Sequence, residues 1–143
     1  MPLIKHGAHG ATLQLPPVAA SGTISTAWQY DTNYGAYGVY DSTAEVMSRG
    51  TLSATVAWTA GDAITLNHYN SAGVLQDAVS IATTAAAHVT LDFTASTAST
   101  GNSLLKGWNM VQGDSVELVV AATTTAGTRG GVGVKLLLQT KGA

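Results

Sequence analysis

An all-β fold, an antiparallel β-sandwich or jelly roll with an extended N-terminal arm, is the architecture that this sequence predicts. Three observations support it. Short stretches alternate apolar residues with Thr, Ser or Ala, Gly-containing turn signals separate them at regular spacing, and no long segment has a helical period. Because 143 residues can build a core without disulfide or metal staples, we expect a single β-sandwich domain over 21–143 after an arm over 1–20.

The arm is predicted from its alternation and its end. Pro16 and Pro17 stop regular pairing, and the arm carries little charge. Its large apolar side chains need a dry partner. They are Leu3, Ile4, Leu13 and Leu15. The sequence leaves two alternatives equally open, because this partner is either the same domain or a neighbouring subunit.

Seven strands are predicted after the arm, each with one buried face. The period-two runs lie at 23–30, 51–58, 62–69, 74–81, 88–94, 115–120 and 132–139. The clearest is 88–94, in which Val89, Leu91 and Phe93 alternate with polar residues. With the arm counted, the pattern predicts eight strands.

Turn residues agree with these strands. Asn70–Gly73 suits a hairpin that joins 62–69 to 74–81. Gly61-Asp62 and Gly113-Asp114 each precede a strand. We favour turn chemistry over internal duplication for this echo, because Gly supplies unusual backbone angles and Asp accepts hydrogen bonds from its own turn.

One short helix is predicted at 42–48. Ser42 and Glu45 have the spacing of a capping box, and Gly50 is placed to end the helix.

Composition excludes several functional classes. Charged residues make up 10% of the chain, against roughly 25% in a typical soluble domain. The absence of cysteine removes disulfides, thiolate metal sites and thiol catalysis. The net charge is -2, and the basic residues are scattered, which disfavours nucleic acid as a partner. These basic residues are Lys5, Arg49, Lys106, Arg129, Lys135 and Lys141. No apolar run is long enough to span a membrane.

The amino terminus has no apolar stretch after its one lysine, so we expect no signal peptide. Exported adhesins need such a signal, whereas a bacteriophage virion protein is assembled in the host cytoplasm without one. The first residues therefore favour the virion class.

No catalytic, cofactor-binding or metal site is predicted. The chain lacks Gly-x-Ser-x-Gly, Walker and His-Glu-x-x-His motifs, so an enzyme has no supporting motif. His6 and His9 lie near no carboxylate, and a zinc site needs three or four ligands. His88 falls on a polar strand face and is expected in solvent.

Two residues on apolar strand faces need an explanation. His68 shares the parity of Ile64 and Leu66, which predicts a partly buried, hydrogen-bonded histidine. Asp77 shares the parity of Leu75. This position indicates either an inward carboxylate with a partner or a β-bulge.

A tyrosine-rich stretch is a candidate interface loop. Its members are Tyr30, Tyr34, Tyr37 and Tyr40. Tyrosines among Gly and Asn suit binding, because Tyr offers a rigid contact area with a polar tip. Packing over the domain edge, contact with another subunit and glycan binding are the three alternatives, in that order of preference.

The arm, the Thr/Ala/Gly-rich strands and the Gly-Asp openings of 61–66 and 113–118 resemble small decoration, or cement, proteins of tailed-bacteriophage capsids. The resemblance implies a homotrimer on the capsid surface of the virion that bridges subunits of the major capsid protein and stabilises the shell. It needs no cofactor, nucleic acid or membrane. The implied capsid-contacting residues are Leu3, Ile4, Leu13 and Leu15. Trimeric fibre heads share the same strand openings, so a receptor- or glycan-binding head of a tail fibre or adhesin is the alternative.

Overall fold

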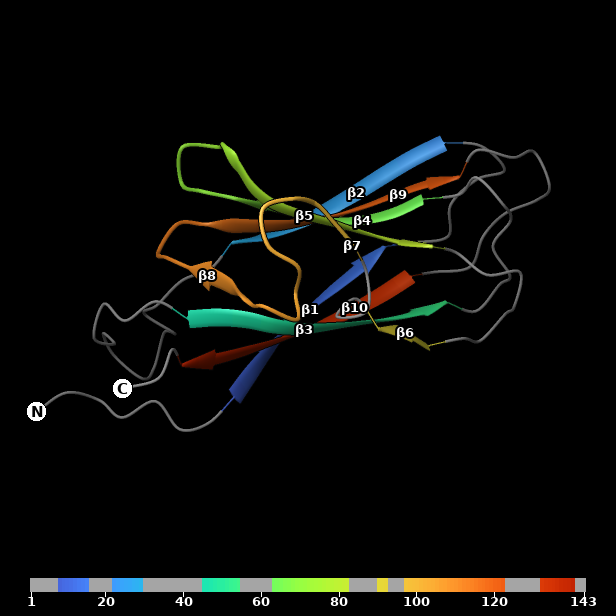
Figure 1. Cartoon of the computed structure of the whole chain (residues 1–143). Coiled ribbons are helices and arrows are strands. Elements are labelled where there is room, and N and C mark those ends of the chain that lie inside the picture. Colours follow the sequence, from blue (N-terminus) through green and yellow to red (C-terminus); the bar gives the residue numbers. More distant parts are fainter. Residues whose placement is uncertain are drawn as a thin grey trace, which may run out of the picture.

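Ten strands in two five-stranded antiparallel sheets make up the part of the chain that the computed structural model describes (Figure 1). The described residues are 8–15, 22–29, 45–54, 63–82, 90–92, 97–122 and 132–140. None of them is helical. The predicted all-β class is therefore confirmed for this part of the chain.

The first sheet, called here the β1 sheet, has the order β1-β10-β3-β6, and β8 also pairs with β3. Its strands are β1 (Ala8–Leu15), β10 (Val132–Thr140), β3 (Glu45–Ala54), β6 (Thr90–Asp92) and β8 (Trp108–Met110). The runs 51–58, 88–94 and 132–139 each overlap a strand of this sheet.

The second sheet, the β2 sheet, has the order β2-β9-β4-β5-β7. Its strands are β2 (Gly22–Gln29), β9 (Ser115–Ala122), β4 (Ala63–Tyr69), β5 (Leu75–Ala82) and β7 (Thr97–Thr100). Four of the runs predicted from alternation correspond to the longer strands. The short strands β7 and β8 escaped prediction, because three or four residues show too little alternation.

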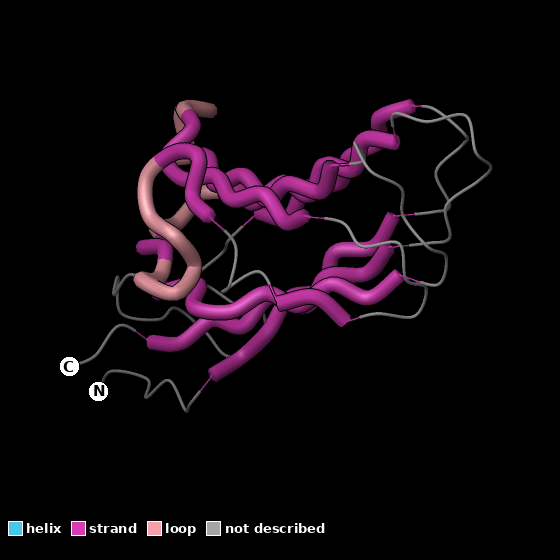
Figure 2. The backbone as a smooth tube through the Cα atoms, turned by 45° about the vertical axis from the view of Figure 1, so that its right-hand side comes forward, coloured by secondary structure: helices cyan, strands magenta, loops and turns pink. Residues whose placement is uncertain are grey.

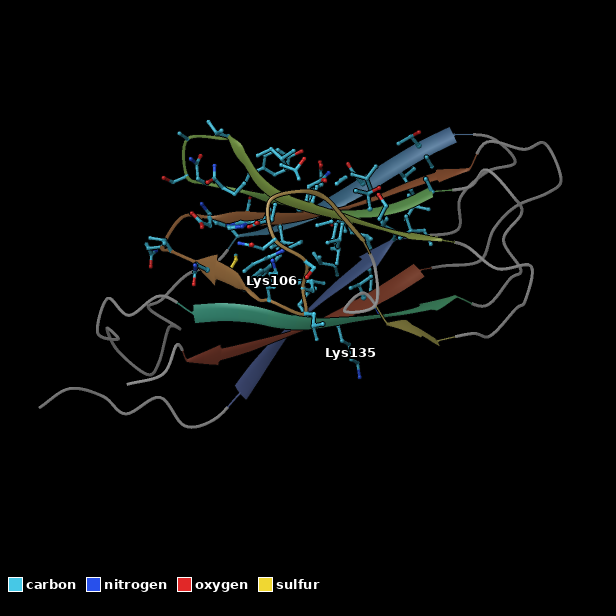
Figure 3. The ribbon with its side chains drawn as sticks, viewed as in Figure 1. Lys106 and Lys135 are labelled. Carbon is cyan, nitrogen blue, oxygen red and sulfur yellow. The ribbon has the colours of Figure 1, made fainter. Side chains whose placement is uncertain are left out.

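One hydrophobic core lies between the two sheets (Figures 1 and 2). In β4, the inward side chains of Ile64, Leu66 and His68 are buried while their neighbours are more exposed. The same alternation holds in β10. There the exposed Lys135 points away from the β2 sheet (Figure 3), and Val134 and Leu136 are buried on either side of it. The period-two pattern thus assigns side chains to core or surface as expected.

Residues 8–15 are not a detached arm. They form β1, which pairs with β10 residue for residue from Ala8 to Leu15. Leu13 and Leu15 retain only 3% and 7% of their exposure and belong to the core. Of the two partners left open by the sequence, the same domain is therefore the observed one for these two leucines. An arm that alternates apolar and polar residues has the pattern of an edge strand, so sequence does not distinguish the two.

The helix expected at 42–48 is wrong over its second half. Residues from Glu45 onward form β3, and Glu45–Met47 pair with β10 on one side and with β8 on the other. A helix cap is worth about 1 kcal/mol, which is less than two rows of backbone hydrogen bonds in a sheet. Residues 42–44 lie outside the described part of the chain.

The predicted hairpin between β4 and β5 is confirmed. The Gly73 N–H donates to the Asn70 carbonyl at 2.9 Å, and Gly73 has a φ of 80°, which favours glycine. The Asn70 side chain also accepts from the N–H groups of Ala72 at 3.0 Å and Val74 at 2.9 Å. Asn70 therefore fixes the turn from within.

Candidate functional site

A buried histidine between two aspartates lies near one end of the core. His68 is at the last inward position of β4, and its side chain is 3% exposed. Its Nδ1 lies 2.7 Å from Asp77 Oδ2, and its Nε2 lies 2.8 Å from Asp114 Oδ2. Both predicted features are confirmed, because His68 is buried and hydrogen-bonded and Asp77 is an inward carboxylate with a partner.

A local irregularity helps to bring Asp77 to His68. The β4–β5 register shifts between His68 and Tyr69, and the β5–β7 register shifts between Ala78 and Val79. Consequently three consecutive residues of β5 are buried, namely Asp77, Ala78 and Val79. The alternative explanation for Asp77 is a bulge. Register shifts do lie on either side of Asp77, one where β5 pairs with β4 and one where β5 pairs with β7.

Both ring nitrogens of His68 face carboxylate oxygens, and this limits the positions that the hydrogens between them can take. An ionised carboxylate only accepts hydrogen bonds. The two short contacts are therefore satisfied together when both ring nitrogens carry a hydrogen, or when one of the aspartates holds a proton. Buried ionic groups require this kind of full pairing, because an unpaired one is costly away from water.

Trp108 contacts the network through both its ring face and its indole nitrogen. Its indole ring stacks on the His68 ring, with centroids 5.8 Å apart and planes inclined by 18°. Its Nε1 donates to the Asn102 carbonyl at 2.7 Å, and the Asn102 N–H donates to Asp77 Oδ1 at 2.8 Å. The contacts therefore form a ring through Trp108, Asn102, Asp77 and His68.

Gly101 permits the contact between Asn102 and Asp77. It has a φ of 62°, and a Cβ at this position would clash with the Gln76 carbonyl and with Asp77 Oδ1. Only glycine fits both the backbone angle and the space. Gly101 thus lets the chain after β7 pass close enough to cover the aspartate.

Asp114 joins the network from the turn before β9. Its Oδ2 also accepts the Val111 N–H at 3.2 Å, and its own N–H donates to the Val111 carbonyl at 2.9 Å. Gly113 has a φ of 91°, and a Cβ there would lie 3.0 Å from the Ser71 side chain. The turn chemistry predicted for Gly113-Asp114 is confirmed, whereas Gly61-Asp62 lies outside the described residues.

The chemistry open to this network is limited by its own pairing. With both nitrogens of His68 bound to carboxylates, the imidazole has no lone pair to offer a substrate proton or a metal ion. In the described part of the chain, no group of three or more His, Asp or Glu side chains is arranged to hold a metal ion. The network instead ties β4 and β5 to the segments around β8.

The loops tied by this network form one end of the molecule. We call residues 70–75, 101–107 and 111–114 the loop end, and Figure 2 shows the described loops gathered there. It carries the large hydrophobic side chains that are exposed in the described part of the chain. These are Val74 (55%), Leu75 (37%), Leu105 (79%) and Val111 (55%). The loop end therefore presents apolar side chains and Lys106 outside, while His68, Asp77 and Asp114 are paired inside.

The outer face of the β2 sheet next to this end carries a weaker polar cluster. Glu117 on β9 accepts from Asn67 Nδ2 at 3.4 Å and from the Tyr69 hydroxyl at 3.3 Å, both on β4. Burial raises the pKa of Tyr69 above its usual value, and the nearby Glu117 carboxylate raises it further. This cluster lies on the outside of the sheet, apart from the His68 network.

The structure describes only two of the residues that the sequence predicts as an interface. Leu13 and Leu15 lie in the core, where they are covered by this domain. The other predicted interface residues, Leu3, Ile4, Tyr30, Tyr34, Tyr37 and Tyr40, lie outside the described part of the chain. His6 and His88 also lie outside it, and His9 is part of β1.

Part of the network can be recognised in the sequence. His68 and Asp77 stand out as polar residues at apolar positions, and Asp114 stands out in its Gly-Asp turn. Nothing in the sequence pairs the three, since His68 and Asp114 are 46 positions apart. Trp108 and Asn102 carried no signal at all.

In the strands and loops that the structure describes, no helix is long and apolar enough to cross a membrane. No protein-family model matches the chain, and no curated protein sequence is significantly similar to it.

Proposed function

We propose that this chain is a structural virion protein, which binds the outer surface of a bacteriophage capsid and stabilises the shell by bridging major capsid subunits. The observation that carries this proposal is the strand order. With the short β7 and β8 set aside, the sheets run β1-β10-β3-β6 and β2-β9-β4-β5. Two interleaved four-stranded sheets in this order are the arrangement of a jelly-roll sandwich, a fold used by viral capsid and lectin domains.

The connections support the jelly-roll interpretation further. The chain passes from one sheet to the other between β1 and β2, β2 and β3, and β3 and β4. After β4 and β5, which share a sheet, every later connection crosses again, and the last strand, β10, returns to lie between β1 and β3. This wrapping is characteristic of Greek keys folded into two layers.

The loop end supports a binding role. Its apolar side chains are held on loops that the His68 network ties down, so little ordering is needed when a partner covers them. Apolar side chains surrounded by few charges are also typical of the buried centre of a protein interface. Because Leu13 and Leu15 are buried, we propose the loop end, with Leu3 and Ile4 ahead of β1, as the capsid contact.

Assembly makes such a contact effective. A homotrimer on the virion surface presents three loop ends, and linked contacts strengthen one another through effective concentration. A module of this kind clamps neighbouring capsid subunits without any chemical step. Fold alone does not determine function, so the proposal depends on binding to a shell.

The test is cosedimentation with capsids assembled from the major capsid protein encoded in the same genome. We expect saturable binding, weakened at least tenfold by the double substitution L105D/V111D. S80D, at an exposed position on β5 outside the loop end, is the matched control and retains binding. Absence of binding to the shell contradicts the proposal, and saturable binding on a glycan array then favours the fibre-head alternative.

A further inference from the structure

We propose that the outer edge of β2 is an interface at which a second copy of this chain adds a strand to the β2 sheet. The β2 strand is the first of its sheet, so its backbone pairs with β9 on one side only among the described strands. The first strand of the other sheet, β1, lies in contact with it. One side of the described structure therefore carries the edges of both sheets that no other described strand pairs.

These edges lack the features that normally prevent pairing. Proteins protect free edges with charged side chains, proline, bulges or very short strands. Here β1 and β2 are eight residues each and contain no proline. No Asp, Glu, Lys or Arg occurs from residue 6 to residue 30, which covers both strands.

The opposite edges of the two sheets are protected in the usual way. β6 has three residues and includes Asp92, and β7 has four residues and a register shift where it joins β5. Charges also occur on inner strands, such as Arg49 on β3 and Lys135 on β10. The absence of charge is therefore not a property of every strand, although β4, β7 and β8 share it, and among the edge strands only β1 and β2 combine it with a length of eight residues.

The geometry of β2 suits the addition of a strand. It pairs with β9 over all eight residues without a register shift, so over 22–27 the backbone groups of its other side, which no other described strand pairs, form a regular ladder. Thr23, Ser25 and Ala27 are exposed on its outer face, and these side chains are small and uncharged. A new strand can approach 22–27 of this edge without displacing a long or ionised outward side chain, because the only long exposed side chain of β2, Gln29, is at its end.

A second copy is the occupant that this edge fits. Like charges directly opposite each other destabilise a strand pair, and charged partners gain when they meet the opposite sign. An uncharged edge offers no attraction to a charged strand of another protein, and it meets no repulsion from its own copy. Pairing of β2 with the β2 or β1 edge of the next copy satisfies this condition, the first as a two-fold dimer and the second as a closed ring.

The inference does not rest on the capsid role, because it concerns the isolated chain. Of the two pairings, the closed ring of β2 with β1 specifies where the copies of the proposed homotrimer meet, whereas the two-fold dimer of β2 with β2 does not build a trimer. The decisive variant is S25K, which places a charge on the exposed face of the β2 edge. S80K is the matched control, because Ser80 lies in the same cross-strand row through Val119 and Thr65 but on the inner strand β5.

The mass of the particle in native mass spectrometry and light scattering is the measurement. We expect an oligomer for the unmodified chain and for S80K, and at least a tenfold weaker association for S25K. Because the chain has no cysteine, S25C and Q14C report the contact cleanly by disulfide crosslinking. A crosslink with S25C alone indicates β2–β2 pairing, and one that needs both cysteines indicates β2–β1 pairing.

Either crosslink supports the inference. A monomeric chain, or an oligomer that S25K leaves intact and neither cysteine crosslinks, overturns it. Circular dichroism of S25K confirms that the variant folds. A monomer that still binds capsids would overturn this interface and leave the proposed function standing.

Discussion

The loop end and the β1–β2 side of this molecule handle polar groups in opposite ways. Near the loop end, His68, Asp77 and Asp114 are buried and paired with one another, while apolar side chains and Lys106 remain outside. At the β1–β2 side, apolar side chains are buried and a row of backbone donors and acceptors faces outward. The first region pairs its groups within one chain, whereas the second offers backbone groups that no other described strand pairs.

The loop end and the β1–β2 side show how a chain with few charged residues distributes them. Asp77 and Asp114 are placed where loops must be fixed, and no charge is placed on the edge strands β1 and β2. The loops of the loop end are held by contacts between side chains that are far apart in sequence. The β2 edge can accept another strand because its exposed side chains are small and neutral. Substitutions in the two regions should accordingly have different consequences. At the loop end they should lower the free energy of unfolding, and at the β2 edge they should weaken association between copies of the chain.

The largest effect is expected for Asp77→Ala at the loop end. It removes the partner of His68 Nδ1 and the acceptor of the Asn102 N–H. Breaking a buried ionic pair by removing one member costs about 3–5 kcal/mol, so we expect the free energy of unfolding to fall by this amount. Urea denaturation measures it as a lower midpoint with an unchanged slope.

Two further variants make this prediction specific. Asp77→Asn keeps an acceptor for Asn102 and should cost less, about 1–2 kcal/mol. Gln76→Ala, at the exposed neighbouring position, should stay within about 0.5 kcal/mol of the unmodified chain. If Asp77→Ala is as mild as Gln76→Ala, the network does not hold the loop end together.

A smaller effect is expected for Gly101→Ala. Alanine is strained at a φ of 62°, and its Cβ would displace the Gln76 carbonyl or Asp77. Gly73→Ala is the matched control, because its φ of 80° imposes similar strain while no atom lies within 4 Å of the added Cβ. The backbone strain costs about 1–2 kcal/mol in each, and we expect Gly101→Ala to cost about 1–2 kcal/mol more. Equal midpoints of thermal unfolding for the two variants would show that Gly101 is needed for its backbone angle alone.

Much of the sheet structure follows from local alternation, and this is why it was predictable. In β4, the spacing of Ile64, Leu66 and His68 alone assigns these three side chains to one face. The hairpin at Asn70–Gly73 is equally local, because the asparagine hydrogen-bonds within its own turn. Such features depend on neighbours in sequence, which a single chain displays.

The candidate site depends on contacts that sequence does not display. Asp77 predicts that a partner exists but not which one, and Trp108 reaches His68 from a three-residue strand. The failed helix at 42–48 has the same origin, since pairing with β10 and β8 overrides a local cap. For β1, the alternation was visible, but the partner strand β10 is near the other end of the chain.

The smallest effect concerns Tyr69, whose polar cluster lies outside the sheet and contrasts with the buried network. Burial and then the Glu117 carboxylate raise the pKa of Tyr69, while its hydrogen bond with Asn67 lowers it. A raised pKa means that folding favours the neutral phenol. Its contribution to the free energy of unfolding is therefore fully present below the unfolded pKa, about 10, and is lost as pH rises through the folded pKa.

The phenolate absorbance of Tyr69, taken as the difference between the unmodified chain and Tyr69→Phe, measures this titration. Glu117→Gln should shift its midpoint to lower pH, because the amide exerts no repulsion on a phenolate. Ser80→Gln, on the outer face of β5, is the control and should leave the midpoint in place. An unchanged midpoint in Glu117→Gln would assign the whole shift to burial. A shifted midpoint with almost unchanged stability near neutral pH would show that outer polar contacts tune a side chain, whereas the buried ones hold the loops.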